Sequence, residues 1–384
     1  MASAPHDEAF MRRALDLARE TAALASPNPQ VGCVLVRDEK IIAEGAHLYA
    51  NRDHAEIVAL KQARQRGIDP AGATAYVTLE PCSHHGRTGP CADALIAARV
   101  SRVVIATEDP NPKVSDQGIS RLRSAGIEVD LGVLRQPARD LNEAFAHFIQ
   151  HRTPFVTLKA ALSIDGYLAP AAGLRSPGRP HWLTGPAARA EVQRLRHASD
   201  AVLTGIGTVL ADDPLLTDRT RLARRRPLLR VILDTHLRIP LDSQLVRSAD
   251  STRGDASDLL ILTAPGASAE KIEALREARA EVESLPEQAG RLSLPAILQT
   301  LADRNLLSLL LECGSCLNGA FLSRNLVDKA ILFYSETELG SHSLPFAEGI
   351  ASPFLFQQSL HRTSRADFGT DACITGYLHD PWKQ

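Results

Sequence analysis

The sequence lacks the features of several protein classes. It has no apolar run approaching the ~18 residues that a membrane helix needs. Its first residues, MASAPHDEAFMRR, contain no apolar core of the signal-peptide kind. Its charges nearly balance, giving a net charge of −2, whereas a nucleic-acid-binding protein is usually visibly basic because neutralised phosphates supply most of its affinity. We therefore predict a cytoplasmic protein that acts on a small molecule, with no nucleic-acid or membrane partner.

Cysteine is also scarce, since the 384 residues include six, at positions 33, 82, 91, 313, 316 and 373. Without a secretion signal, so few cysteines indicate reduced thiols or metal ligands rather than a disulfide scaffold. There is no internal repeat. The apolar share of 44% and the charged share of 23% are ordinary for a globular chain and exclude a disordered, collagen-like or coiled-coil protein. At ~150 residues per domain, the length allows two or three domains.

The first part of the chain alternates between helix-like and strand-like patterns. We predict helices over residues 7–24, 53–66, 90–99, 118–125 and 137–151, and strands over 31–36, 41–45, 75–79, 103–106 and 127–131. Asp53 is the expected N-cap of its helix, and Pro90 is expected at the first helical position. This alternation favours an α/β sandwich with helices on both faces of a sheet.

A second block with its own alternation begins near Thr153. We predict strands over residues 155–162, 200–204, 229–234, 258–263, 307–312 and 329–334, and helices over 186–197, 269–280 and 316–326. The boundary is placed at about residues 147–153, which gives a first domain over 1–147 and a second over 153–384. The two blocks differ in pattern, so the second is not a duplicate of the first.

Three potential metal ligands and one carboxylate occur in the first block. His54 and Glu56 open a helix, Cys82 follows a strand, and Cys91 lies near the start of another helix. Zinc favours thiolate and imidazole ligands, and a catalytic zinc site has three protein ligands with a fourth position open to water. Glu56 is placed to move protons without ligating the metal. We expect the helix dipole to favour the thiolate of Cys91.

This order of residues matches the signature of zinc nucleobase deaminases except in the spacing of the cysteines. The signature has two residues between them, whereas eight (SHHGRTGP) separate Cys82 from Cys91. The insert contains His84 and His85, and either could replace a cysteine as ligand. Three-ligand His/Cys/Cys sites are the attested pattern, which favours His54, Cys82 and Cys91.

The chemistry of the second block is less explicit. Gly205 and Gly207 follow a strand, but Leu210 stands where the dinucleotide fingerprint needs its third small residue, so a classical Rossmann loop is rejected. Cys313 and Cys316 have no second ligand pair nearby, which disfavours a metal site. A glycine-rich turn over residues 312–320, with backbone N–H groups offered to a phosphate, suits this segment better.

The first block closely resembles the deaminase half of the bifunctional deaminase/reductases of riboflavin biosynthesis. The resemblance rests on SPNPQVGCVLV (26–36), the HAE motif at 54–56, TLEPCSHHGRTGPC (78–91) and EDPNPKVSDQG (108–118). In that family the longer insert between the two cysteines is normal. The resemblance implies a cytidine-deaminase-like α/β/α sandwich in which water at one zinc ion per chain attacks the pyrimidine carbon that bears the amine. It also implies that Glu56 shuttles protons and that Asn28 lies beside the substrate.

The second block resembles the reductase half of the same family, which has a dihydrofolate-reductase-like α/β fold and binds NADPH. The matching segments are LKAALSIDG (158–166), HWLTG (181–185), LTGIGTVLADDPLLTDR (203–219), LDT (233–235) and ECGSCLNGAFL (312–322). The implied NADPH contacts are Leu162, Trp182, Thr208, Asp212, Thr235, Gly314, Ser315, Cys316, Leu317, Asn318, Gly319 and Ala320. The implied substrate contacts are Arg196, Leu216, Arg219 and Glu312. Pro180 replaces the family's usual serine, and the chain after Thr337 matches only loosely.

The sequence therefore predicts a bifunctional, NADPH-dependent and zinc-dependent enzyme of riboflavin biosynthesis. The resemblance implies hydrolytic deamination of 2,5-diamino-6-(5-phosphoribosylamino)pyrimidin-4-one, followed by reduction of its ribosyl chain to ribityl. We also expect a homo-oligomer. The main alternative is a nucleic-acid base deaminase joined to an unrelated domain, because such an enzyme would share the HAE motif and the cysteines. The balanced charge and the GTVLADDP segment argue against it.

Overall fold

The computed structural model describes residues 5–83, 89–112, 114–175, 178, 180–250 and 257–383. The chain divides into two compact units. One comprises Met1–Arg152 together with residues 223–225 and 382–384, and the other comprises Thr153–Leu222 with Arg226–Pro381. None of the helices in the described ranges is long and apolar enough to cross a membrane.

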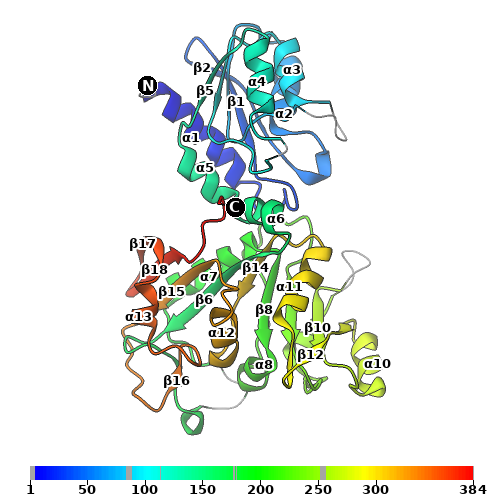
Figure 1. The fold of residues 1–384 in the computed structure, drawn as a ribbon, viewed down its shortest axis with the longest axis vertical. Helices are drawn as coiled ribbons and strands as arrows, with labels where there is room; N and C mark the ends of the chain where they lie inside the picture. Colours follow the sequence, from blue (N-terminus) through cyan, green and yellow to red (C-terminus); the bar gives the residue numbers. More distant parts are fainter. Residues whose placement is uncertain are drawn as a thin grey trace. The chain divides into compact units, whose positions relative to one another are not determined.

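The first unit is built on a five-stranded sheet in the order β2-β1-β3-β4-β5 (Figure 1). β1 pairs antiparallel with β2 and β3, while β3, β4 and β5 are parallel to one another. The elements are α1 (Pro5–Arg19), β1 (Gly32–Arg37), β2 (Lys40–Ala46), η1 (Tyr49–Asn51), α2 (Ala55–Gln65), β3 (Thr74–Val77), α3 (Cys91–Ala97), β4 (Arg102–Ile105), α4 (Gln117–Ser124), β5 (Glu128–Leu131), α5 (Arg135–Leu141) and α6 (Glu143–His151).

Alternation along the strands makes this unit a three-layer sandwich. On β1, Cys33 and Leu35 point to one face and pack with α2, α3 and α4, whereas Val34 and Val36 point to the other face and pack with α1 and α5. Successive side chains of a strand face opposite ways, so a strand covered on both sides is apolar at every position. This explains the unbroken apolar run VGCVLV and places the helix-borne residues of α2 and α3 on one face.

The second unit contains a nine-stranded sheet in the order β11-β10-β9-β8-β14-β6-β15-β18-β17. Its elements are β6 (Phe155–Leu162), β7 (Tyr167–Ala169), η2 (Ala172–Leu174), α7 (Pro186–Ala198), β8 (Ala201–Gly205), α8 (Ile206–Asp212), β9 (Leu229–Leu233), α9 (Gln244–Arg247), β10 (Leu259–Thr263), α10 (Ala269–Glu277), β11 (Glu281–Ser284), β12 (Glu287–Gln288), β13 (Arg291–Leu292), α11 (Leu294–Asp303), β14 (Ser308–Leu311), α12 (Ser315–Leu322), β15 (Lys329–Tyr334), β16 (Leu344–Pro345), α13 (Pro353–Gln357), β17 (His361–Phe368) and β18 (Asp371–Tyr377).

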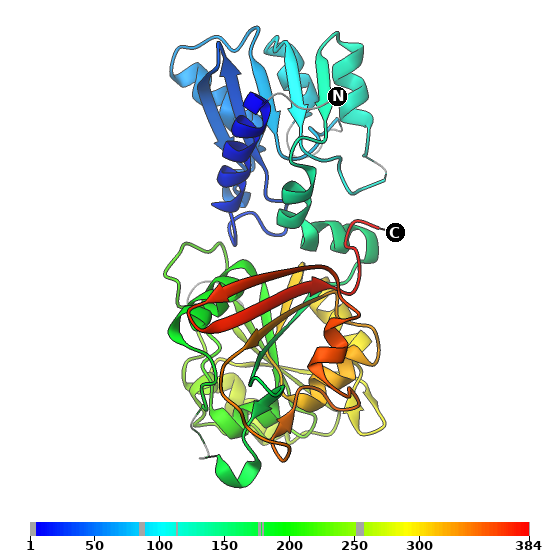
Figure 2. The same ribbon diagram turned by 90° about the vertical axis from the view of Figure 1, so that its left-hand side faces the viewer.

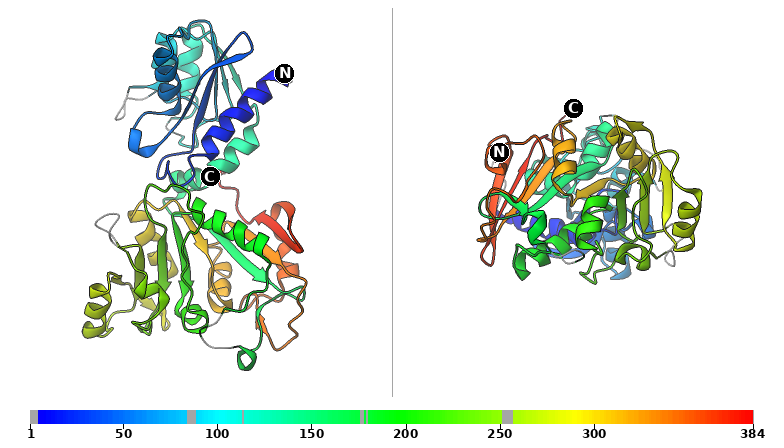
Figure 3. Two further views of the ribbon diagram at one scale, coloured as in Figure 1. Left: turned by 180° about the vertical axis from the view of Figure 1, so that it is seen from behind. Right: turned by 90° about the horizontal axis from the view of Figure 1, so that it is seen from below.

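The strands from β11 to β15 in this sheet are parallel, and an antiparallel hairpin of β17 and β18 completes it beyond β15 (Figure 2). Helices α11, α12 and α13 pack on one face. Helices α8, α9 and α10 cover the other face, together with α7, which packs on β15 and β18 (Figure 3). In such sheets ligands bind beyond the carboxyl ends of parallel strands, which here are the ends of β8, β9 and β14.

The predicted fold class, a deaminase-like sandwich followed by a reductase-like α/β domain, is confirmed. Several local predictions were wrong. The first helix ends at Arg19 rather than at residue 24, and Asn142 divides the helix predicted over 137–151 into α5 and α6. The Asn142 side chain exchanges two hydrogen bonds with the backbone of Gln30, at 2.8 and 3.0 Å. This contact lies 112 residues away in the sequence, so no local pattern reveals the break.

Candidate active sites

Three metal-ligating side chains converge at the ends of three elements of the first unit. His54 is the N-cap of α2, Cys82 lies in the turn that follows β3, and Cys91 is the first residue of α3. Asp53 is therefore not the N-cap, and its carboxylate pairs with Lys61 instead. Likewise Pro90 is the N-cap of α3 rather than its first helical residue.

The distances among these side chains suit a tetrahedral zinc ion. His54 Nδ1 lies 3.2 Å from Cys91 Sγ and 3.5 Å from Cys82 Sγ. All three ligand atoms lie within 4.8 Å of one another. Zinc–sulfur and zinc–nitrogen bonds of ordinary length at a tetrahedral angle put nitrogen and sulfur ~3.5 Å apart. The three side chains therefore form a candidate three-ligand zinc site. His84 and His85, the alternative ligands, lie outside the described residues.

The pKa values of the two thiols are shifted in opposite directions. The pKa of the Cys82 thiol is lowered to about 4, chiefly because the Cys91 thiol donates a hydrogen bond to it, and the Cys91 backbone N–H donates to the same sulfur at 3.3 Å. The pKa of Cys91 is raised by that same hydrogen bond and by burial. The first N–H group of α3 points at the sulfur of Cys82, and the expectation that the helix dipole favours the Cys91 thiolate stays a prediction.

Glu56 lies in the first turn of α2, two residues after His54, and is buried, with 3% of its surface exposed. Burial raises the pKa of its carboxyl group to about 7. A group with a pKa near neutrality can both accept and release a proton. Glu56 is not among the three clustered ligands. Its position therefore suits proton transfer beside a metal rather than ligation.

Asn28 is held in place by a residue that the sequence did not single out. Its Nδ2 donates to Nε2 of His47 at 2.9 Å, and Nδ1 of His47 donates to the carbonyl of Asp53 at 2.7 Å. The His47 ring packs edge-on against the ring of His54, with centroids 5.6 Å apart. The pKa of His47 is lowered, mainly by burial, which keeps the ring neutral and able to accept from Asn28. No motif surrounds His47, so only the structure could find it.

A cavity of about 450 Å³ opens in the second unit where β8 and β14 end. Seven of the predicted contacts line it: Thr208, Asp212, Glu312, Gly314, Ser315, Cys316 and Leu317. Lys159 and Arg175 also line it and were missed by the sequence analysis. Lys159 could have been noticed, because it is a lone charge inside the apolar strand FVTLKAAL.

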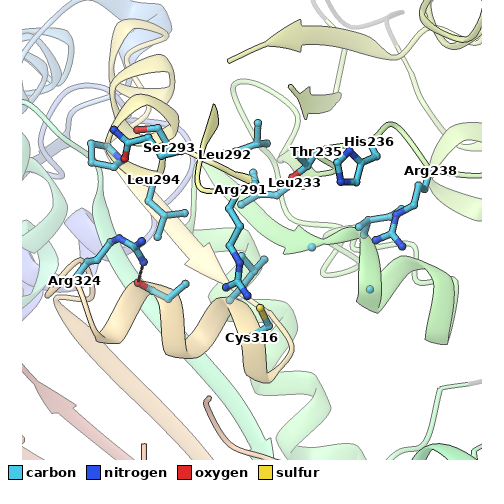
Figure 4. Close-up of a pocket in the computed structure, with 18 residues that line it drawn as sticks. Leu233, Thr235, His236, Arg238, Arg291, Leu292, Ser293, Leu294, Cys316 and Arg324 are labelled. Carbon is cyan, nitrogen blue, oxygen red and sulfur yellow. Dashed lines mark hydrogen bonds between the residues drawn. The ribbon is translucent and has the colours of Figure 1, made fainter. Parts of the chain in front are cut away.

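A second cavity of about 390 Å³ shares Gly205, Gly207, Cys316 and Leu317 with the first. Figure 4 shows His236 and Arg238, which follow β9, toward one end of this cavity and Arg324, which follows α12, at the other. Thr235 and Ala320, both predicted contacts, lie in the wall of the second cavity. Apolar side chains from β9 and α11 line it alongside Arg238 and Arg324, which suits a ligand with a flat ring and several negative charges.

The segment between β14 and α12 differs from the turn predicted over residues 312–320. Only residues 312–314 form a turn, and Ser315 already begins α12, so Asn318, Gly319 and Ala320 are helical. The N-cap of α12 is Gly314, which has no side chain to cap the helix. Within the described residues, the buried hydroxyl of Ser315 has no hydrogen-bond partner. An unpaired hydroxyl and free helix N–H groups on a cavity wall fit the pyrophosphate of a dinucleotide.

The remaining predicted contacts do not line either cavity. Leu162 is buried in β6, Leu216 is buried, and Trp182 and Arg219 are exposed. Asn318 donates to the carbonyl of Phe346, and a Cβ at Gly319 would lie 2.2 Å from the Glu348 carbonyl. Gly319 is thus required for close packing. Arg196 does not line the first cavity but donates a hydrogen bond to Glu312, which does.

Two family descriptions match the chain. "Cytidine and deoxycytidylate deaminase zinc-binding region" matches residues 4–107, and "RibD C-terminal domain" matches residues 154–371. The second match spans more than half of the chain and identifies the reductase half. It therefore excludes the alternative of a base deaminase joined to an unrelated domain.

Similarity to known proteins extends over almost the whole chain. The riboflavin biosynthesis protein RibD of Escherichia coli (strain K12) is 41% identical over 389 residues, covering 96% of this chain and 98% of that protein. That of Synechocystis is 37% identical over 377 residues, with 97% and 96% covered. Among solved structures, Acinetobacter baumannii RibD gives a TM-score of 0.79 at 35% identity, and a Thermotoga maritima diaminohydroxyphosphoribosylaminopyrimidine deaminase/5-amino-6-(5-phosphoribosylamino)uracil reductase gives 0.80 at 33% identity. Both alignments cover 97% of this chain and 98% of the other.

Proposed function

The chain belongs to the RibD family of bifunctional deaminase/reductases of riboflavin biosynthesis, and from that premise we propose which residues carry each reaction and on which substrate. We propose that domain 1–147 deaminates 2,5-diamino-6-(5-phosphoribosylamino)pyrimidin-4-one and that domain 153–384 reduces the ribosyl chain of the product with NADPH. The enzyme acts in the cytoplasm as a homo-oligomer.

His54, Cys82 and Cys91 would hold one zinc ion in the deaminase site. Zinc supplies a water molecule that is acidified enough to attack at neutral pH. Glu56, whose carboxyl group has a pKa of about 7, takes a proton from the attacking water and returns it to the amine, which leaves as ammonia. Asn28, fixed by His47, orients the pyrimidine ring.

NADPH would occupy both cavities of the reductase unit and cross between them at Gly205, Gly207, Cys316 and Leu317. It supplies a hydride to the ring-opened ribose. The N-terminus of α12 and the Ser315 hydroxyl bind the pyrophosphate. Thr208 and Asp212 in the first cavity would contact the nicotinamide end, and Thr235 in the second cavity would contact the adenosine end. The family resemblance adds Leu162, Trp182 and residues 314–320 as cofactor contacts, of which Leu162, Trp182, Asn318 and Gly319 line neither cavity in this structure. Glu312 would face the substrate in the first cavity, with Arg196 holding its carboxylate. The family resemblance adds Leu216 and Arg219 as substrate contacts.

The observation that carries this proposal is the His54, Cys82 and Cys91 cluster with Glu56 buried beside it. The test supplies the diaminopyrimidine ribosyl phosphate and NADPH and follows ammonia release and NADPH oxidation together. We expect one zinc per chain and the release of ammonia before NADPH is oxidised. Cys91→Ser should lose tight zinc binding and ammonia release, while NADPH oxidation with the deaminated substrate persists. Full zinc occupancy in Cys91→Ser would shift the assignment to His84 or His85.

A further inference from the structure

The buried carboxylate of Glu80 accepts four backbone hydrogen bonds. Its Oε1 accepts from the N–H groups of Gly118 and Ile119, at 3.0 and 3.3 Å. Its Oε2 accepts from those of Asp109 and Asp116, at 3.3 and 3.1 Å. A carboxylate has about four lone-pair sites, so the backbone of one segment, which follows β4, occupies all of them.

Two of these bonds cap helix α4 from a distant part of the chain. The N-cap residue of α4, Asp116, has a φ of 65° and makes no side-chain capping bond. Gly118 and Ile119 are the second and third residues of the helix, and their N–H groups are those that an N-cap side chain normally satisfies. Glu80 supplies that cap, and its negative charge lies at the positive end of the helix dipole.

Cys82, two residues after Glu80, caps the N-terminus of helix α3 in the same way. Its sulfur accepts from the N–H of Cys91 at 3.3 Å, and its carbonyl accepts from the N–H of Ala92 at 3.1 Å. The three residues from Glu80 to Cys82 thus hold the N-termini of α4 and α3, which lie side by side in Figure 1. The position of the Cys82 sulfur depends on both attachments.

Direct packing leaves this turn little freedom to move. A Cβ at Gly118 would lie 1.9 Å from the carbonyl oxygen of Pro81, so the first turn of α4 touches the peptide between Glu80 and Cys82. Ser83 donates a hydrogen bond to the side chain of Gln117 at 3.4 Å. Loss of the Glu80 anchor would release the turn from α4 on one side while α3 still holds it on the other.

We propose that Glu80 is a positioning residue for the metal site: by anchoring the turn that follows β3 to the start of α4, it fixes Cys82 at ligating distance from His54 and Cys91. The inference rests on the proposed zinc site. Glu80 is not one of the three clustered ligands and acts through Cys82. This role adds to the metal site a residue whose hydrogen-bond partners lie 29 to 39 positions further along the chain.

The test compares metal binding in the wild-type chain and in Glu80→Gln. Glutamine keeps the size of the side chain, but its amide has one oxygen and turns an NH₂ group toward two of the four N–H donors. Apoprotein is titrated with Zn²⁺ against a chelator, and the thiolate charge-transfer bands are recorded after loading with Co²⁺. We expect zinc affinity to fall 10- to 100-fold, as is typical when a residue that orients a ligand is lost, and the cobalt bands to change.

The matched control is Asp7→Asn. Asp7 is another buried carboxylate of the same unit, and it accepts from Tyr76 at 2.7 Å and from Arg102 at 2.9 Å. It lies in α1, on the opposite face of the sheet. We expect Asp7→Asn to lower thermal stability and leave zinc affinity and the cobalt bands unchanged. If both variants lose zinc affinity equally, the effect is general destabilisation and the proposal fails.

Two further results distinguish failure of the positioning role from failure of the zinc site. Wild-type zinc affinity and cobalt bands in Glu80→Gln would overturn the positioning role while leaving the zinc site intact, whereas a wild-type chain that binds no zinc would overturn the zinc site itself. If Glu80→Gln is insoluble, Gly118→Ala disturbs the same contact from the helix side. A wild-type cobalt spectrum in soluble Gly118→Ala would then overturn the proposal, and an altered spectrum with weaker zinc binding would support it.

Discussion

Glu312 accepts two hydrogen bonds from the guanidinium group of Arg196, 2.6 Å from Nε and 3.0 Å from Nη2. Both residues were expected to contact substrate, yet they bind each other. Glu312 lines the first cavity and Arg196 does not. Lys159 approaches Glu312 from the cavity side, with its Nζ 3.7 Å from Oε2. Arg196 therefore acts by orienting Glu312, and Glu312 and Lys159 present the charges to the cavity.

Glu312→Gln should destabilise the protein and weaken reduction. The side chains of Arg196 and Glu312 are 10% and 11% exposed, and breaking a buried pair leaves an uncompensated charge that costs about 3 kcal/mol. Denaturant unfolding measures this cost. The control is Glu191→Gln, which breaks a pair with Arg194 on the surface of α7 and should cost no more than ~1 kcal/mol. NADPH oxidation should fall only in Glu312→Gln, and ammonia release in neither.

The contribution of Glu312 to stability should also depend on pH. Burial raises the pKa of its carboxyl group, but Arg196 and Lys159 outweigh that effect and the pKa is lowered below 4.5. A group whose folded pKa is depressed stabilises the fold fully above its unfolded pKa and loses that contribution as the pH falls through the folded value. The difference in unfolding free energy between wild type and Glu312→Gln should therefore be constant above about pH 5.5 and shrink below ~pH 4.5. A difference that grows on acidification would contradict the assignment.

The side chains predicted as metal ligands lie together in the structure, whereas only some of the predicted reductase contacts line a cavity, and the difference has a physical reason. His54 and Glu56 are neighbours on one helix turn, and the two cysteines lie at the ends of elements, so short motifs capture them. Lys159 reaches the cavity from β6, which lies between β14 and β15 in the sheet. Its partner Glu312 lies more than a hundred residues later in the chain. Only the folded sheet brings them together. The hairpin of β17 and β18 was missed because β17 is exposed almost throughout and has no apolar alternation.

Glu56→Gln should separate metal binding from catalysis. The amide keeps the shape of the side chain but cannot accept a proton from the attacking water. We expect one zinc per chain by elemental analysis and ammonia release reduced at least ~10²-fold. Given the deaminated substrate, the same preparation should oxidise NADPH at the wild-type rate, which serves as the internal control for folding. Loss of zinc from Glu56→Gln would instead make Glu56 a ligand.

The preference for NADPH over NADH should depend on Arg238. The two cofactors differ by one phosphate on the adenosine ribose. Within the described residues, His236 and Arg238 make no hydrogen bond or ion pair, and both line the second cavity beside Thr235. If the dinucleotide crosses from the first cavity at Gly205 and Gly207, this end of the second cavity receives the adenosine. An arginine there is suited to bind the extra phosphate through its fork of N–H donors.

Arg238→Ala should therefore weaken binding of NADP⁺ by ~10- to 100-fold, the loss expected for a charge-assisted hydrogen bond of about 1.5–3 kcal/mol, and leave binding of NAD⁺ unchanged. Calorimetric titration of both dinucleotides measures the ratio directly, without turnover. The control is Arg247→Ala, which removes an exposed arginine from α9 that lines neither cavity. Equal weakening of both dinucleotides by Arg238→Ala would place Arg238 on a group that they share. Loss of the preference in Arg324→Ala instead would put the adenosine phosphate at the opposite end of the cavity, because Arg324, which follows α12, lies there (Figure 4).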